Sequence, residues 1–269
     1  MKDGHVHSPY CPHGSKDDFE EYIKNAIDVG LTEITFTEHL PLPNGFVDIS
    51  PERDSAMKIE DIDDYISTVK KLQVQYKDKI KINVGVEVDY VEGYEDEIKY
   101  MLDKYGPYLD DSIISVHIIN INGNYHLIDY SIEEFGNIII LLDGVENVYT
   151  KYYQTIKNAI NSNLGKYKPK RIGHLNIVRK FNQVFPYEYS KHPLLVDVVK
   201  SIKEKGYEVD YNISGYRKKE CKEAYISGEL LTLIEEYEIP MILGSDSHRA
   251  EDIKYYKSIC TEDNVLKFG

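Results

Sequence analysis

Cysteine is scarce in this 269-residue sequence, and tryptophan is absent. The three cysteines, Cys11, Cys221 and Cys260, are few and odd in number, which indicates reduced thiols rather than a disulfide framework. No apolar run approaches the ~20 residues needed to span a bilayer, and the N-terminal residues from Met1 to His5 do not have the composition of a signal peptide. We therefore expect a cytoplasmic protein without a membrane partner.

Basic residues are also in the minority, because 32 Lys and Arg stand against 46 Asp and Glu, for a formal net charge of −14. A nucleic-acid partner would require a basic face, so this balance argues against one. It suits a small or partly cationic substrate. With 42% hydrophobic residues and no low-complexity segment, the chain can bury a full core, as one large domain or two small ones.

What the sequence does contain is histidine beside carboxylates at the ends of predicted strands. Seven of the nine histidines lie there with two acidic residues: His5, His7, His13, His39, His117, His174, His248, Glu87 and Asp246. His5 and His7 alternate by two, so both would face the same side of a strand. Zinc, iron and manganese accept imidazole and carboxylate ligands. Because one tetrahedral ion cannot use so many ligands, the set predicts two or three metals, as in sites that hydrolyse phosphate esters.

Short β-branched or apolar runs alternate with segments of helical periodicity. The predicted strands are residues 3–7, 33–37, 81–88, 112–117, 171–174, 208–212 and 240–244, and the predicted helices include 62–76, 94–105, 145–164, 193–205 and 222–237. A further helix is predicted between the first two strands, after a capping box from Ser15 to Asp18 and before Gly30. Strand followed by helix, seven times over, predicts parallel βαβ units.

Parallel units can form an open sheet or a closed barrel. The predicted metal ligands follow nearly every strand, which favours the rim of a barrel over the single switch point of an open sheet. No G-x-G-x-x-G or P-loop pattern supports the open sheet. We predict an α/β fold with one domain over residues 1–269, a distorted TIM-like (β/α)7 barrel with its active site at the C-terminal rim of the strands. Segment 40–57 would form a loop over the mouth, and 129–143 a short outer helix.

The sequence also resembles the polymerase and histidinol phosphatase (PHP) family, nearly from end to end. The resemblance is carried by DGHVHSPYCPHGS, ITFTEHLPLP, DISPERDSAM, GVEVDY, YGPYLDDSIISVH, YKPKRIGHL, DYNISGYRK and LGSDSH. Within the family, the chain looks like the monofunctional bacterial histidinol-phosphate phosphatases. The insert after His39 and the DYNISGYRK segment favour that group, since they are narrower features than the metal ligands.

The resemblance implies two to three divalent ions (zinc, iron or manganese) and assigns their ligands. The first ion would take His5, His7, Glu87 and Asp246, the second would share Glu87 and add His117 and His174, and the third would take His13, His39 and His248. Every position holds the residue type that the family requires. A metal-bound hydroxide would attack phosphorus, with Glu87, Asp246 and Arg217 as the catalytic residues.

Substrate contacts are predicted from the segment that ends in Arg217. Its guanidinium would meet phosphate oxygens in a bidentate fork, and the alternative is a solvated arginine at a helix start. Asn212 and Ser214 are predicted to line the same pocket. Glu38 and Asp89 lie next to predicted ligands and would orient them, or else cap the following loops.

The remaining polar residues give weaker predictions. Asp48, Glu52 and Asp54 of the insert are candidates to contact the amine and imidazole of histidinol phosphate. Arg171 is expected in a solvated basic turn, and Asp110 and Asp111 are expected in a tight turn. His126 and His192 are expected at the surface or in loops. Cys11 either lies close to the metals or is a small, partly buried thiol.

We therefore expect hydrolysis of L-histidinol phosphate to L-histidinol and phosphate, in histidine biosynthesis. The alternative is a PHP phosphoesterase acting on nucleotides, a DNA 3′ end or other small phosphate esters, although no basic face suits DNA. A non-enzymatic, metal-binding barrel would lack some ligands, and none is missing. The sequence does not predict the oligomeric state.

Overall fold

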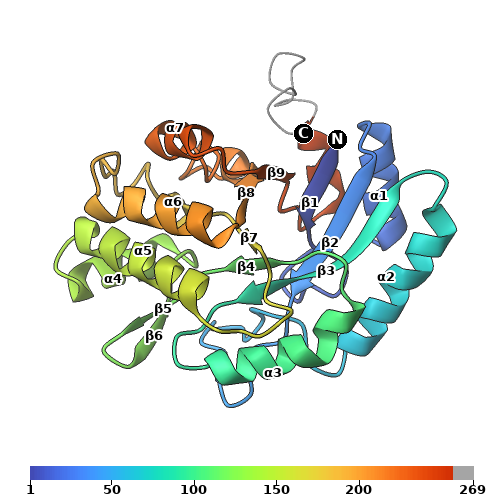
Figure 1. Cartoon of the computed structure of the whole chain (residues 1–269), viewed down its shortest axis with the longest axis horizontal. Helices are drawn as coiled ribbons and strands as arrows, with labels where there is room; N and C mark the ends of the chain where they lie inside the picture. Colours follow the sequence, from blue (N-terminus) through green and yellow to red (C-terminus); the bar gives the residue numbers. More distant parts are fainter. Residues whose placement is uncertain (257–269) are drawn as a thin grey trace.

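A computed structural model describes residues 1–256 of the chain, so Cys260 lies outside the described residues (Figure 1). Seven parallel strands form one sheet in the order β1-β2-β3-β4-β7-β8-β9. Their bounds are β1 Lys2–Val6, β2 Glu33–His39, β3 Lys81–Asp89, β4 Ile113–Ser115, β7 Arg171–Ile172, β8 Glu208–Asn212 and β9 Met241–Gly244. These strands agree with the seven predicted from the sequence, within a few residues at each end.

The sheet curves until its last strand meets its first. The backbone N–H of His7 donates to the Ser247 carbonyl at 3.0 Å, and the N–H of Asp246 donates to the His5 carbonyl at 2.8 Å. An isolated parallel bridge also joins Val6 to Ser247. The predicted seven-stranded, TIM-like barrel is therefore confirmed, with closure made by the chain just after β9.

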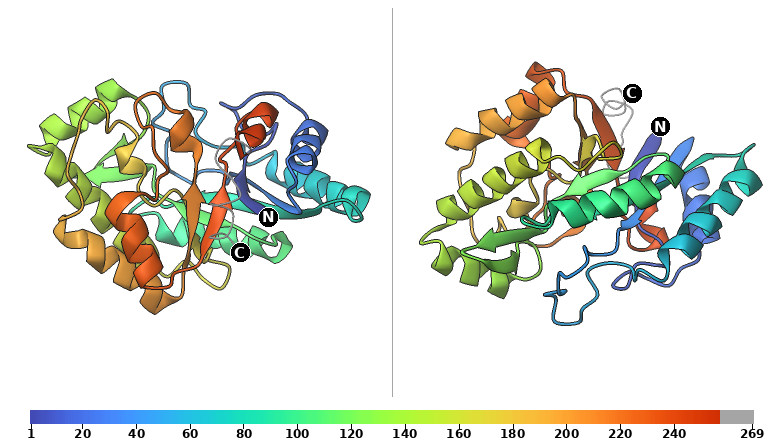
Figure 2. Two further views of the ribbon diagram at one scale, coloured as in Figure 1. Left: turned by 90° about the horizontal axis from the view of Figure 1, so that it is seen from above. Right: turned by 60° about the horizontal axis from the view of Figure 1, so that its bottom comes forward.

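Helices surround the strands (Figure 2). They are α1 Phe19–Asp28, α2 Ile62–Tyr76, α3 Glu95–Tyr105, α4 Ile132–Leu141, α5 Val145–Asn161, α6 Pro193–Lys205, α7 Gly228–Glu236 and the 3-10 helices η1 Gly106–Tyr108, η2 Ile177–Arg179, η3 Ser214–Arg217 and η4 Ala250–Tyr255. Each α-helix buries an apolar stripe, as in α5, where Tyr149, Tyr153 and Ile156 share one buried face. No helix among residues 1–256 is long and apolar enough to cross a membrane.

One predicted helix cap and one predicted helix start are wrong. The side chain of Asp18, not Ser15, caps α1, because an Asp18 carboxylate oxygen accepts from the Glu21 N–H at 2.9 Å. Helix α7 begins at Gly228, six residues later than residue 222, because the chain after Arg217 forms an irregular segment that borders the site described below. Local side-chain capping decides the first boundary and tertiary packing the second.

The segments between the barrel strands contain one element that was not predicted from the sequence. Strands β5 Ile118–Ile121 and β6 Asn124–Leu127 form an antiparallel hairpin. Its turn is Asn122-Gly123, with φ of 54° and 89°, the left-handed conformation that this residue pair tolerates. Helix α4 is the short helix predicted within 129–143. Segment 40–57 contains no helix or strand.

The N-terminal ends of the strands bury a pair of charges. Arg171 is only 2% exposed, and its Nη2 donates to the Gly4 carbonyl at 2.8 Å and to Asp111 Oδ2 at 2.9 Å. Lys2 Nζ donates to the same carboxylate oxygen at 2.9 Å. The prediction of a solvated basic turn at Arg171 is therefore wrong. Asp111 is not merely a turn residue but the counter-ion inside the base of the barrel.

Candidate metal centre

Parallel strands end at the same rim, and this topology brings the predicted ligands together. His5 lies in β1, His39 ends β2 and Glu87 lies near the end of β3. His7, His117, His174, Asp246 and His248 follow strands β1, β4, β7 and β9, and His13 lies in the loop before α1. Asp246 has φ of 51°, an uncommon conformation for a residue other than glycine and one that often marks a functional site.

Glu87 lies at the centre of this rim, and its two oxygens face different histidines. Oε2 is 3.3 Å from His5 Nε2, 3.4 Å from His7 Nε2 and 3.4 Å from His39 Nδ1. Oε1 is 2.9 Å from His174 Nε2 and 3.8 Å from His117 Nε2. A carboxylate divided in this way between two groups of nitrogens can bridge two ions.

Asp246 lies beside the histidines that face Oε2 of Glu87. Its Oδ1 lies 3.3 Å from His7 Nε2, 3.6 Å from His5 Nε2 and 3.5 Å from His248 Nδ1. Potential ligand atoms that all lie within 4.8 Å of one another form three groups: His5 with His7 and Glu87; Glu87 with His117 and His174; and His7 with Cys11, His39 and His248. The first two groups correspond to the two ions predicted to share Glu87.

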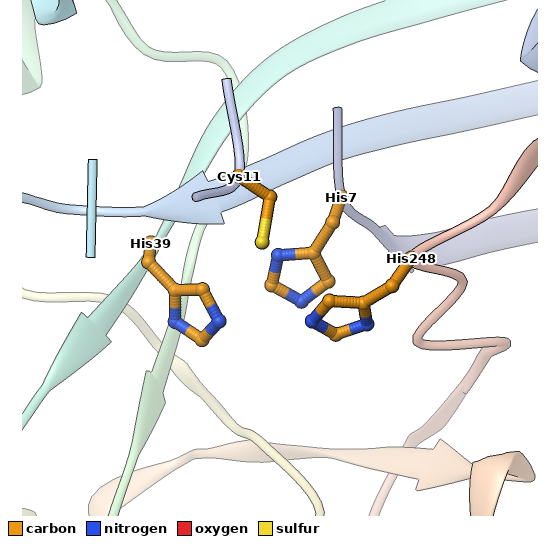
Figure 3. A group of neighbouring side chains, drawn as sticks. All are labelled: His7, Cys11, His39 and His248. Atoms are coloured by element: carbon orange, nitrogen blue, oxygen red, sulfur yellow. The ribbon is translucent and has the colours of Figure 1, made fainter. Parts of the chain in front are cut away.

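The third group differs in composition from the predicted set of His13, His39 and His248 (Figure 3). The rings of His7 and His248 stack with centroids 3.8 Å apart. His13 lies beside this group, with its Nε2 3.2 Å from His248 Nε2. The buried thiol of Cys11 stands within the group, so of the two alternatives left open by the sequence, Cys11 lies close to the predicted ligands.

The donor set fits divalent cations. Among the potential ligand atoms of the described residues, His5 Nε2, His7 Nε2, and His39 Nδ1 and Nε2 are buried without a hydrogen-bond partner. Such atoms are costly in a folded protein, and a cation among them would satisfy their lone pairs. Imidazole with carboxylate suits zinc, iron and manganese.

The charges of the site attract protons when no cation is bound. Burial alone would lower the pKa of the His5 imidazole, but the carboxylates of Glu87 and Asp210 raise it to about 10. Burial likewise opposes protonation of His117, and Asp89 raises its pKa to about 10. Burial would raise the pKa of Glu87, yet the facing histidines hold it well below its ordinary value. Metal binding would therefore displace protons from His5 and His117.

Carboxylates behind the histidines fix the orientation of the rings. His5 Nδ1 donates to Asp210 Oδ2 at 2.7 Å, and His117 Nδ1 donates to Asp89 Oδ1 at 2.5 Å. Glu38 contacts the ring of His7, 3.4 Å from Nδ1, and not the ring of His39 as we expected. Its other oxygen accepts from the Ser8 N–H and hydroxyl. Metal-bound histidines need such partners. Asp210 was not predicted from the sequence, although it shares a face of β8 with Asn212.

A cavity of about 590 Å³ opens over the ligands. Arg217 lines it, and its Nη2 donates to the carbonyls of Ser245 and Asp246 at 2.9 and 3.2 Å. Its Nη1 is buried without a hydrogen-bond partner. One end of the guanidinium is therefore fixed by backbone, and the other end offers an unused donor.

The two residues predicted beside Arg217 occupy different places. Ser214 lines the cavity, and its hydroxyl donates to Asp246 Oδ2 at 3.0 Å. Asn212 is completely buried below the cavity, and its Nδ2 contacts Asp210 Oδ2 at 3.0 Å and Asp246 Oδ2 at 3.3 Å. The position of Asn212 suits it to hold Asp246 in place.

Three cavity cations were not predicted: Lys180, Lys218 and Arg249. Lys180 donates to Asp129 Oδ2 at 2.9 Å. Burial, helped by the charge of Lys180, lowers the pKa of Lys218. The run Arg217-Lys218-Lys219 was the only available signal for Lys218 in the sequence, and no pattern pointed to Lys180.

The insert contributes one wall of the cavity. Ser50, Glu52, Asp54 and Ser55 line it, and His13 Nδ1 donates to the Asp54 carbonyl at 2.7 Å. Asp48 instead accepts from the N–H groups of Ser50 and Ser55, both at 2.9 Å, and holds the loop together. Of the three acids considered for substrate contact, Glu52 and Asp54 are at the cavity.

Two predicted surface histidines are outside the centre. His126 lies in β6, and its Nδ1 pairs at 2.9 Å with Oε1 of Glu134 in α4. His192 lies in a loop, one of the two predicted locations, but it is buried: its Nδ1 caps α6 by accepting from the Leu194 N–H, and its Nε2 lies 3.1 Å from Thr150 Oγ1. Helix capping explains its burial.

Comparison with known proteins agrees with this arrangement. Residues 3–214 match the model of the PHP domain family. The chain is similar to a histidinol-phosphatase of Bacillus subtilis, with 43% identity over 94% of this chain and 96% of the relative. A crystal structure of a candidate histidinol phosphatase from Listeria monocytogenes has a TM-score of 0.92 and 33% identity, covering 97% of this chain and 100% of that one.

A second solved structure shares the fold at lower identity. It is a histidinol phosphate phosphatase of Lactococcus lactis in complex with zinc, L-histidinol and phosphate. Its TM-score is 0.71 at 22% identity, covering 100% of this chain and 94% of that one.

Proposed function

This chain belongs to the PHP domain family, and from that premise we propose that it hydrolyses L-histidinol phosphate to L-histidinol and phosphate. The observation that carries the proposal is Glu87, whose two oxygens face separate histidine groups beneath a cavity lined by Arg217. A phosphate monoester is a dianion, and such a site offers it cations above a bridging carboxylate. A place in histidine biosynthesis and in the cytoplasm belongs to the same proposal.

The nine predicted ligands would hold two to three divalent ions, zinc, iron or manganese. His5, His7 and Asp246 would share one ion with Glu87, and His117 and His174 a second. His13, His39 and His248 would hold the third. Ions bound there supply an activated water and neutralise charge on the phosphoryl group. Glu38, Asp89 and Asp210 would hold the imidazole rings in place behind them.

Arg217 and its neighbours would bind the phosphate in the cavity that they share with the histidines. The Nη1 of Arg217, which has no hydrogen-bond partner, would donate to a phosphate oxygen, since Nη2 is already held by two carbonyls. Lys218 brings a second positive charge to the same cavity. Ser214 contacts Asp246 and keeps that carboxylate turned toward His5 and His7.

The insert would select for the organic part of the substrate. Histidinol phosphate carries an amine and an imidazole, both of which are cationic when protonated. Glu52 and Asp54 line the cavity and present carboxylates at its wall. Tyr130 donates its hydroxyl to Glu52 Oε2 at 2.9 Å, which restrains that side chain. The amino groups of nucleobases are not cationic at neutral pH, so a nucleotide would gain less from these acids.

The test compares substrates with the metals quantified. Phosphate release from L-histidinol phosphate is measured beside release from nucleotide monophosphates and a simple alkyl phosphate. We expect kcat/KM to be highest for histidinol phosphate. In the Glu52→Gln/Asp54→Asn variant, kcat/KM for histidinol phosphate should fall toward the values for the other substrates, while kcat/KM for the alkyl phosphate stays the same. A protein that holds its metals but leaves histidinol phosphate intact, or that prefers nucleotides, would contradict the proposal.

A further inference from the structure

Cys11 is a thiol in the midst of potential metal ligands, and the proposed function gives it no role. Its side chain is completely buried. Its sulfur lies with nitrogens of His7, His39 and His248 in a group whose atoms are all within 4.8 Å of one another. Figure 3 shows the sulfur pointing toward the rings rather than away from them. A thiol used only for packing would not need this surrounding.

The backbone holds the thiol in that orientation. The Cys11 N–H donates to the Ser8 carbonyl at 3.0 Å, and the Gly14 N–H donates to the Cys11 carbonyl at 3.4 Å. A Cβ at Gly14 would lie 3.0 Å from Cys11 Cβ and 3.3 Å from its Sγ. Glycine therefore lets the loop close tightly behind the cysteine, which turns the sulfur to the histidines.

His39 supplies the second, independent observation. It is 5% exposed, and neither ring nitrogen has a hydrogen-bond partner. A buried imidazole with both nitrogens unused is costly unless an ion is bound. Cys221 provides the contrast, since its buried Sγ contacts the Glu223 carbonyl at 3.6 Å and it belongs to none of the ligand groups among residues 1–256.

We propose that Cys11 is a thiolate ligand of the ion bound by His39 and His248. His13, whose Nε2 is 3.2 Å from His248 Nε2, is placed to be the fourth ligand. On binding, the Sγ–H proton passes to solvent and a metal–sulfur bond takes its place. This inference rests on the proposed metal centre but not on the identity of the substrate.

A sulfur ligand changes which ion the third site prefers. Thiolate favours zinc, iron(II) and cobalt(II) over manganese and magnesium, whereas imidazole and carboxylate alone discriminate less. Three nitrogens and one sulfur also form a complete tetrahedral set for zinc. The third ion would then be held more by the protein and less by substrate than the two ions that share Glu87.

Cobalt(II) substitution tests the ligand directly, because a thiolate bound to cobalt gives an intense near-ultraviolet charge-transfer band and nitrogen or oxygen ligands do not. The metal-free full-length protein is titrated with cobalt and followed by absorbance. The key sample is the Cys221→Ser/Cys260→Ser variant, in which Cys11 is the only thiol of the chain. The matched sample is Cys11→Ser, with folding checked by circular dichroism.

We expect the band in the wild type and in the variant that keeps only Cys11, and no band in Cys11→Ser. In Cys11→Ser, chelator competition should show weakening of one site by more than the ~10–100-fold that loss of an outer hydrogen-bond partner costs. If Cys11→Ser does not fold, the single-thiol variant still decides, because its spectrum depends on Cys11 alone.

Absence of the band in the single-thiol variant at saturating cobalt overturns the proposal, as does a band that persists in Cys11→Ser. Phosphate release is measured on the same samples. A protein that hydrolyses histidinol phosphate without showing the band keeps its proposed function and loses the thiolate ligand. A protein that shows the band but does not hydrolyse histidinol phosphate keeps the thiolate ligand and loses its proposed function.

Discussion

The two ends of the barrel both bury charge, but they pair it with different cations. At the C-terminal rim, the carboxylates of Glu87 and Asp246 face histidines. At the N-terminal end, Asp111 faces Arg171 and Lys2. A histidine can give up its proton and bind a metal instead, whereas an arginine stays charged at every accessible pH.

The rim can therefore exchange protons for metal ions, whereas the N-terminal end keeps the same charged side chains. At the rim, several buried ring nitrogens lack hydrogen-bond partners, and their protons can be replaced by divalent cations. At the base, Arg171 fills the space inside the strands and donates to the Gly4 carbonyl and to Asp111. Changes at the rim should therefore affect catalysis, and changes at the base should affect stability.

The largest expected effect follows from Glu87→Gln at the rim. An amide cannot share two anionic oxygens between ions, so we expect kcat for histidinol phosphate to fall by at least about 10³-fold. Metal content should fall as well, which elemental analysis would measure. A decrease below tenfold would refute the bridging role.

The matching change at the base is Asp111→Asn. It leaves Arg171 charged and buried without a full counter-ion, and breaking a buried pair in this way costs about 3–5 kcal/mol. Asp111 is 22% exposed and Lys2 shares it, so we expect the lower end of that range. Urea unfolding measures the loss, and kcat of the folded protein should stay near the wild-type value.

A double variant sharpens the same comparison. Arg171→Met added to Asp111→Asn removes the stranded charge and keeps a side chain of similar length, so most of the lost stability should return. If the double variant is less stable than Asp111→Asn alone, packing around Arg171 rather than charge dominates the base of the barrel.

The third prediction concerns Arg217→Lys at the rim. A lysine keeps the charge but cannot hold two carbonyls with one nitrogen and reach phosphate with another. We expect kcat/KM to fall by about 10–100-fold, with metal content and melting temperature unchanged. Equal activity in the two proteins would show that the Nη1 of Arg217 does not contact the substrate.

The rim could be predicted from the sequence because parallel strands end at one edge. Residues such as His39, Glu87 and His174 lie far apart in the chain, yet each is at or just after a strand, and the topology brings them together. A turn signal was also available for the hairpin, since Asn122-Gly123 follows an isoleucine-rich run and is a residue pair that two-residue hairpin turns favour. This local pattern was overlooked.

The base could not be predicted in the same way. Arg171 ends the basic run from Lys166, which has the composition of an exposed turn, and its partner Asp111 is 60 residues away. The two residues meet because Asp111 precedes β4 and Arg171 begins β7, and these strands are neighbours in the sheet. Asp210 and His5 are 205 residues apart and meet because the sheet closes on itself. Pairing across a barrel depends on three-dimensional closure that periodicity and composition do not contain.

The smallest effect expected is on the pH dependence of the base. Burial alone would raise the pKa of Asp111, but the charges of Arg171 and Lys2 hold it below the ordinary value of 3.8. A carboxyl group whose pKa is lower in the folded state stabilises the fold above about pH 4, and that stabilisation disappears as pH falls through the folded-state pKa.

Wild type and Asp111→Asn should therefore differ most in unfolding free energy near neutral pH and converge in acid, because a protonated Asp111 is no better a counter-ion than an asparagine. Urea unfolding between pH 2 and pH 7 measures both curves. A difference that stays constant over this range would mean that the carboxylate acts by its shape and hydrogen bonds rather than by its charge. In that case the fixed charge of Arg171, and not the charge of Asp111, would distinguish the N-terminal end of the barrel from the metal-binding rim.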